Sequence, residues 1–99
     1  MAIMQITLIP LGTATPSVGE YVVAAQKYLT EEGVPHTLTD MGTIIEGEPE
    51  YLFALAARLH SLPFAQGAQR VVTQIALDDR RDRKIGLGDK RASVQARLD

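Results

Sequence analysis

The sequence predicts an α+β domain, in which a four-stranded antiparallel sheet carries two helices on one face and a short C-terminal helix follows. Three observations favour this class. Segments with the two-residue period of strands alternate with segments of helical period, glycine and proline fall between them, and 45% of the residues are hydrophobic. With 99 residues the chain is long enough for one domain and too short for two, so residues 1–99 are expected to form a single domain.

The first predicted element is a strand over Ile3–Leu11, which is rich in Ile and Leu and ends at a proline and a glycine. Its even positions from 4 to 8 are apolar and predict the core side, whereas positions 5 and 7 are Gln and Thr. A helix is predicted to begin at Ser17, because Glu20 three residues later completes a capping-box pattern. Gly33 is expected to end this helix.

Two short strands are predicted next, over His36–Met41 and Thr43–Glu46, with Gly42 between them in a tight hairpin or a bulge. Pro49 suits the first turn of a second helix. Pro63 lacks the N–H that a helix interior needs, so this helix is expected either to kink there or to end just before it and restart.

A fourth strand is predicted over Arg70–Leu77, and Asp89–Leu98 in the charged tail is expected to form the final helix. The order β-α-β-β-α-β is that of a ferredoxin-like sandwich, which leaves one sheet face without helices. The residues expected on this second face are Ile3, Gln5, Thr7, Ile9, Val72, Gln74, Ala76 and, if Leu38 faces the core, Thr37, Thr39 and Met41.

This second face is mostly uncharged, although a solvated antiparallel face usually carries Lys, Glu and Arg in alternation. We therefore expect it to be a meeting surface between copies of the chain, in a homodimer or a homotetramer. The alternative is a modestly polar face that is open to water. A domain of this size also buries a limited core, so association would add useful burial.

Composition argues against several classes of protein. The net charge is -2, so there is no positive excess to hold a nucleic acid. There is no cysteine, which excludes disulfides, thiol catalysis and cysteine metal sites. No apolar run approaches the roughly 20 residues of a membrane span, and the N-terminus lacks a signal-peptide pattern, so a cytoplasmic protein without membrane or metal partners is expected.

Polar residues that could act in a site are few. The two histidines have no relation to a nucleophile in the sequence, so no catalytic residue is predicted. The charged run 78–84 is either a solvated loop with local ion pairs or places Asp78 or Arg80 beside a pocket or a neighbouring subunit. Glu46 lies in an apolar strand and needs a cation, a hydrogen-bond donor or water as its partner.

Several short segments together resemble the small thiamine-binding protein family, formerly a domain family of unknown function. Each segment is weak alone, but they span nearly the whole chain in the right order. The matching segments are Ile9–Thr13, Pro16–Val18, Tyr21–Val22, Leu38–Thr39, Met41–Thr43, Ile45–Gly47, Gly67–Ala68, Arg70–Thr73, Asp78–Asp82, Lys90 and Ser93–Val94. Gly19, where the family pattern has serine, and Pro63 are the departures.

The resemblance implies a ferredoxin-like fold, dimers or tetramers built through the sheets, and binding of thiamine or its hydroxymethylpyrimidine half without catalysis. No cofactor is implied besides this ligand. Glu46 would accept a hydrogen bond from the pyrimidine amine and balance the thiazolium charge. The other residues expected at the ligand are Leu11, Gly12, Thr13, Ser17, Thr39, Met41, Thr43, Ile45 and Arg80.

Three other functions stay open on the sequence. A regulatory domain that binds another metabolite, such as an amino acid, would have the same fold. An RNA-binding module of this strand order needs exposed aromatic residues on its central strands, and Ile3–Leu11 and Thr43–Glu46 contain none. A small enzyme, such as an isomerase or an acyl-phosphate hydrolase, needs a positioned acid–base group, and none is evident.

Overall fold

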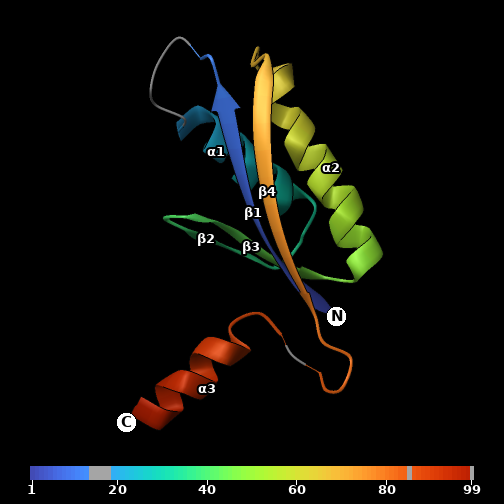
Figure 1. The fold of residues 1–99 in the computed structure, drawn as a ribbon, viewed down its shortest axis with the longest axis vertical. Coiled ribbons are helices and arrows are strands. Elements are labelled where there is room, and N and C mark those ends of the chain that lie inside the picture. Colours follow the sequence, from blue (N-terminus) through green and yellow to red (C-terminus); the bar gives the residue numbers. More distant parts are fainter. Residues whose placement is uncertain (14–18, 85, 99) are drawn as a thin grey trace.

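A computed structural model describes residues 1–13, 19–84 and 86–98 of the chain. It contains a four-stranded sheet, two helices packed on one side of that sheet, and a third helix that lies apart from them (Figure 1). The elements in chain order are β1 (Ala2–Leu11), α1 (Gly19–Glu31), β2 (His36–Thr39), β3 (Gly42–Gly47), α2 (Pro49–Ala65), β4 (Arg70–Asp79) and α3 (Asp89–Leu98).

The sheet has the strand order β2-β3-β1-β4 with every neighbouring pair antiparallel, which confirms the predicted α+β class. The first strand pairs with β4 over its whole length, from Ala2 opposite Asp79 to Leu11 opposite Arg70. Its pairing with β3 ends at Ile6 opposite Thr43. The C-terminal half of β1 therefore has a strand neighbour on one side only, which is where a strand tolerates the missing N–H of proline at position 10.

The core lies between this sheet and the two helices. The even positions of β1 face it as predicted, since Met4 and Ile6 are buried and Leu8 packs against the same cluster. On the helical side, α2 supplies most of the buried volume. The buried residues of the cluster are Ala2, Met4, Ile6, Ala25, Leu29, Val34, Ile45, Leu52, Leu55, Ala56 and Leu59.

Three element boundaries differ from the sequence prediction. The second strand ends at Thr39, because residues 40 and 41 form the hairpin turn and Gly42 already belongs to β3. The fourth strand continues to Asp79, because its pairing with β1 persists to Ala2. The predicted start of α1 at Ser17 lies outside the described residues, and the described part of this helix begins at Gly19.

The second helix neither breaks nor restarts at Pro63. It continues two residues further, to Ala65, and the Pro63 ring is fully buried. The proline lies in the last turn, so few helical bonds remain to be disturbed. Its carbonyl accepts hydrogen bonds from the backbone N–H groups of Gln66 and Ala68, each 3.0 Å long, which close the helix end.

Candidate functional site

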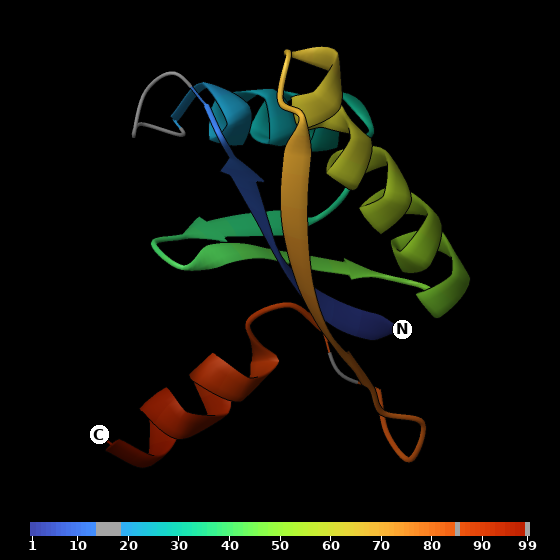
Figure 2. The same ribbon diagram turned by 45° about the horizontal axis from the view of Figure 1, so that its top comes forward.

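The helix-free face of the sheet contains most of the candidate residues. Figures 1 and 2 show α1 and α2 on one side of the strands and no element of the described chain spread over the other. The antiparallel register places directly opposite residues on the same face, so the alternation of β1 extends to its neighbours. The residues on this open face are Ile3, Gln5, Thr7, Ile9 and Leu11 of β1, Thr37 and Thr39 of β2, Ile44 and Glu46 of β3, and Val72, Gln74, Ala76 and Asp78 of β4.

Two carboxylates lie at one end of this open face. Glu46 and Asp78 are the cross-strand neighbours of Ile3 on its two sides. The side chain of Glu46 is half-buried and has no hydrogen bond or ion pair to another described residue. Gly86 passes close by, since a Cβ on it would lie 3.2 Å from Oε1 of Glu46. This end can therefore accept a cation that contacts apolar surface.

The β2–β3 hairpin folds its turn toward β1 on the same face. The hydroxyl of Thr7 donates a 2.9 Å hydrogen bond to the carbonyl of Met41. Within the turn, the Thr39 hydroxyl donates to the carbonyl of Gly42 at 2.8 Å and accepts from the N–H of Met41 at 3.2 Å. The Met41 side chain is 77% exposed, so it is available to cover a ligand or a neighbouring chain.

Two of the predicted ligand residues face the core instead. Ile45 has no exposed surface and pairs with Met4, while Thr43 is 8% exposed and its hydroxyl accepts a 3.0 Å hydrogen bond from Nε2 of Gln26. The residue that shares a face with Glu46 is Ile44, which the sequence analysis did not select. The signal was present, because residues two apart along a strand share a face.

The strand-to-helix loop lies at the far end of the open face. Leu11 is on that face, while Gly12 and Thr13 follow it beyond the end of β1; Ser17 lies outside the described residues. Along β1, Leu11 is about 27 Å from Ile3, at roughly 3.3 Å per residue. One small ligand therefore does not contact both Glu46 and Leu11 of the same protomer.

Arg80 follows β4 at the acidic end of the sheet, and its guanidinium is engaged locally. Its Nη2 donates to Oδ2 of Asp82 at 2.9 Å. The hydrogen bond from Arg80 lowers the pKa of the Asp82 carboxyl, and the same bond raises the pKa of the arginine. Of the two sequence alternatives at this strand end, Asp78 is on the open face, whereas Arg80 pairs within the charged run.

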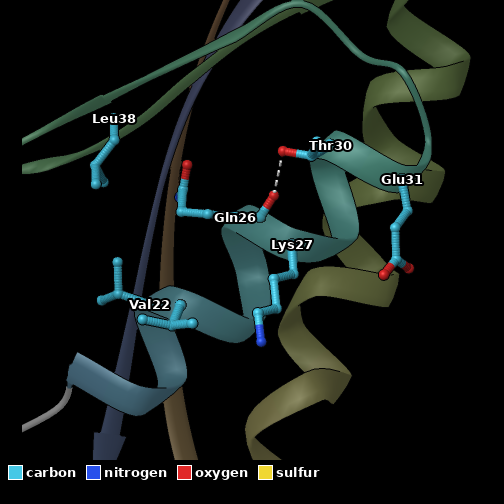
Figure 3. A pocket seen from close by; sticks show the side chains of 7 residues that line it. Val22, Gln26, Lys27, Thr30, Glu31 and Leu38 are labelled. Atoms are coloured by element: carbon cyan, nitrogen blue, oxygen red, sulfur yellow. Dashed lines mark hydrogen bonds between the residues drawn. The ribbon is translucent and has the colours of Figure 1, made fainter.

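A separate groove lies on the other side of the sheet, between α1 and the outer strand β2 (Figure 3). It is open and has a volume of about 580 Å³. Leu38 faces the helix side, as predicted, and borders this groove opposite Val22. The residues that line it are Val22, Val23, Gln26, Lys27, Thr30, Glu31 and Leu38. It contains neither Glu46 nor the hairpin turn.

Within the described ranges, no group of three or more His, Asp or Glu side chains is placed to hold a metal ion. No helix among the same residues has the length and apolarity to cross a membrane. His60 is used in packing, since its Nδ1 lies 2.6 Å from the Thr73 hydroxyl and its ring meets Phe64 edge-on.

Comparison with known proteins identifies the relatives of this fold and open face. The family model described as "Thiamine-binding protein" matches residues 4–95 of the chain. The chain belongs to the thiamine-binding protein family. The UPF0045 protein YqgV of Bacillus subtilis is 47% identical over 99% of this chain and 98% of its own length. A UPF0045 protein of Methanothermobacter thermautotrophicus is 36% identical and matches over 99% of this chain and 100% of its own.

Solved structures of similar proteins share the fold. A protein of Methanocaldococcus jannascii superimposes with a TM-score of 0.83 at 24% identity, over 95% of each chain. A protein of Thermotoga maritima, whose name assigns it to thiamine biosynthesis or salvage, has a TM-score of 0.78 at 20% identity, over 94% of this chain and 97% of its own. Together with the family match, these structures confirm the ferredoxin-like arrangement that the sequence predicts for this member of the thiamine-binding family.

Proposed function

We propose that this member of the thiamine-binding family binds thiamine or its hydroxymethylpyrimidine half without transforming it, on the open face of the sheet, in an assembly of two or four copies. Family membership supports the ligand class. Such binding would serve storage, delivery or sensing of the compound. The absence of catalysis is part of the proposal.

The observation that carries this proposal is the acidic end of an otherwise uncharged face. Thiamine joins a flat aminopyrimidine to a cationic thiazolium. Glu46, which has no polar partner among the described residues, and Asp78 offer negative charge on both sides of Ile3. A carboxylate there accepts from the pyrimidine amine and attracts the thiazolium, while the isoleucine contacts the ring.

The proposed assembly completes the site. In one protomer, the loop after Leu11 and the carboxylate of Glu46 are at opposite ends of the open face. Two copies that pack these faces together with their strands running in opposite directions would bring the loop of one to Glu46 of the other. Such face-to-face packing also covers the Gln and Thr side chains, which would hydrogen bond across the interface or to the ligand.

A thermal-shift series tests the ligand class. Thiamine, its phosphates, hydroxymethylpyrimidine and a panel of amino acids are each added well above their expected dissociation constants. A ligand at about a hundred times its dissociation constant adds roughly 2.7 kcal/mol of stability, which raises the Tm of a domain of this size by about 10 °C or more. A shift with an amino acid and none with the thiamine compounds would assign the fold to a different metabolite instead.

Glu46→Gln is expected to weaken thiamine binding about ten-fold or more, measured by isothermal titration calorimetry. The substitution keeps the shape of the side chain but removes its charge and one acceptor, and a lost charged contact costs about 1.5–3 kcal/mol. Glu48→Gln, on an exposed residue just beyond β3, removes the same charge outside the open face and is the matched control. Equal affinity in the wild type and in the Glu46 variant would remove this residue from the site.

A further inference from the structure

The C-terminal helix makes almost no contact with the rest of its own chain. No residue of α3 is buried, and Val94 and Leu98 are 52% and 73% exposed. Figures 1 and 2 show it beyond the end of the sheet, away from α1 and α2. Its printed link to the sheet is the ion pair of Lys90 with Asp78, with 3.9 Å between Nζ and Oδ2. A ten-residue helix is marginal in isolation, so α3 needs a partner surface.

The side chains of α3 define what that surface must offer. Val94 and Leu98 are four residues apart and lie on one face of the helix. Arg91 shares this face, and Lys90 and Arg97 border it on the other side, by the helical period. The helix therefore presents a short apolar stripe between cationic side chains, and the complementary surface is apolar with acidic residues around it.

The charge of the chain is divided at the end of β4. Residues 1–79 contain nine acidic and three basic side chains, a net charge of -6. Residues 80–99 contain three acidic and seven basic side chains, a net charge of +4, and the two parts sum to the -2 of the whole chain. The segment that has no partner within its own protomer thus has the opposite sign to the body of that protomer.

We propose that α3 packs on the acidic body of a second copy and holds the two copies together. This inference rests on the assembly in the proposed function and extends it to a second contact. Charge complementarity selects the partner, because the body of every other copy offers the opposite charge that this segment lacks at home. An anionic membrane is a poorer partner, since the body would be repelled and a stripe of two apolar residues gives little insertion.

The absence of cysteine allows a direct test. Val94→Cys, labelled with a benzophenone maleimide in the full-length chain, is mixed with unlabelled, nitrogen-15-enriched protein and irradiated. We expect cross-links between chains that map to residues 1–79 of the partner and decrease in 0.5 M salt. Ser61→Cys, on the exposed side of α2, is the control and is expected to give at least ten-fold fewer cross-links.

The outcomes separate this inference from the proposed function. An oligomeric protein whose Val94 label reacts only within its own chain would overturn the role of α3 and leave the sheet interface and thiamine binding intact. A protein that is monomeric at all concentrations would overturn both contacts between copies, while thiamine binding is judged by its own thermal shift. Stable binding of the protein to vesicles of phosphatidylserine and phosphatidylcholine would assign α3 to a membrane and overturn the inference.

A charge reversal provides a second readout that does not depend on labelling. Arg97→Glu is expected to raise the dissociation constant of the assembly about ten-fold in sedimentation velocity at low salt, and by less in 0.5 M salt. Lys27→Glu makes the same charge change on an exposed residue of α1 and is expected to change that constant by less than two-fold. Equal effects of the two variants would indicate a response to net charge and contradict a specific contact of α3.

Discussion

Gln5→Arg is expected to convert the assembled protein to separate protomers and to abolish most thiamine binding at micromolar concentration. Gln5 is at the centre of the open face, between Ile44 on β3 and Ala76 on β4. A two-fold interface would bury two such arginines among uncharged groups. An uncompensated buried charge costs about 3–5 kcal/mol, so the dissociation constant of the assembly should rise by roughly two orders of magnitude or more.

The measurement is sedimentation velocity over a concentration series, with calorimetry of thiamine on the same samples. Gln69→Arg is the matched control, because it makes the same substitution at an exposed residue before β4 and should leave the assembly unchanged. The spectrum of the variant by circular dichroism should stay that of the wild type, since Gln5 is outside the core. A fully assembled Gln5→Arg protein would show that the open face is solvated and would end the case for an interface there.

Gly42→Ala is expected to lower the free energy of unfolding by about 2–3 kcal/mol, which corresponds to a fall of roughly 10 °C or more in Tm. A Cβ at position 42 would lie 2.6 Å from Oγ1 of Thr7 and 3.0 Å from the carbonyl oxygen of Ile6. The backbone of the hairpin and that of β1 therefore meet too closely for any side chain. To admit the methyl group, the turn must move away from β1 and lose the hydrogen bond from Thr7 to Met41.

Gly33→Ala distinguishes this contact from backbone strain. Gly33 has a φ of +68° and nothing within 4 Å of its added Cβ, so alanine there pays conformational strain of about 1 kcal/mol and meets no neighbour. Chemical denaturation should rank Gly42→Ala as clearly more damaging. If the two glycines tolerated alanine equally, the close approach of the hairpin to β1 would have little energetic weight.

The sequence alone determined the order and the class of the elements, because these depend on local period and on helix and strand breakers. The two-residue alternation from Met4 to Leu8 identified the core side of β1 correctly. Its errors were confined to points where tertiary contacts decide: β4 continues to Asp79 because β1 supplies a partner there, and Pro63 stays helical because its ring is buried and its carbonyl closes the helix.

The site divides in the same way. Glu46 could be selected from the sequence as a carboxylate in an apolar strand that needs a partner, and β pairing then placed Asp78 on the other side of Ile3. The sequence analysis grouped Ile45 and Thr43 with Glu46 because they are adjacent in the chain, although they face the core.

What the sequence by itself determined is therefore the fold, the helix-free and uncharged face, and the reversal of charge at the end of β4. Only the tertiary structure decided which side chains share that face, how far apart its two ends lie, and that α3 has no partner within its own protomer. The physical reason is that period and composition are properties of neighbouring residues. Strand register and the contacts of α3 depend on where the chain returns in space, and local sequence does not encode that position.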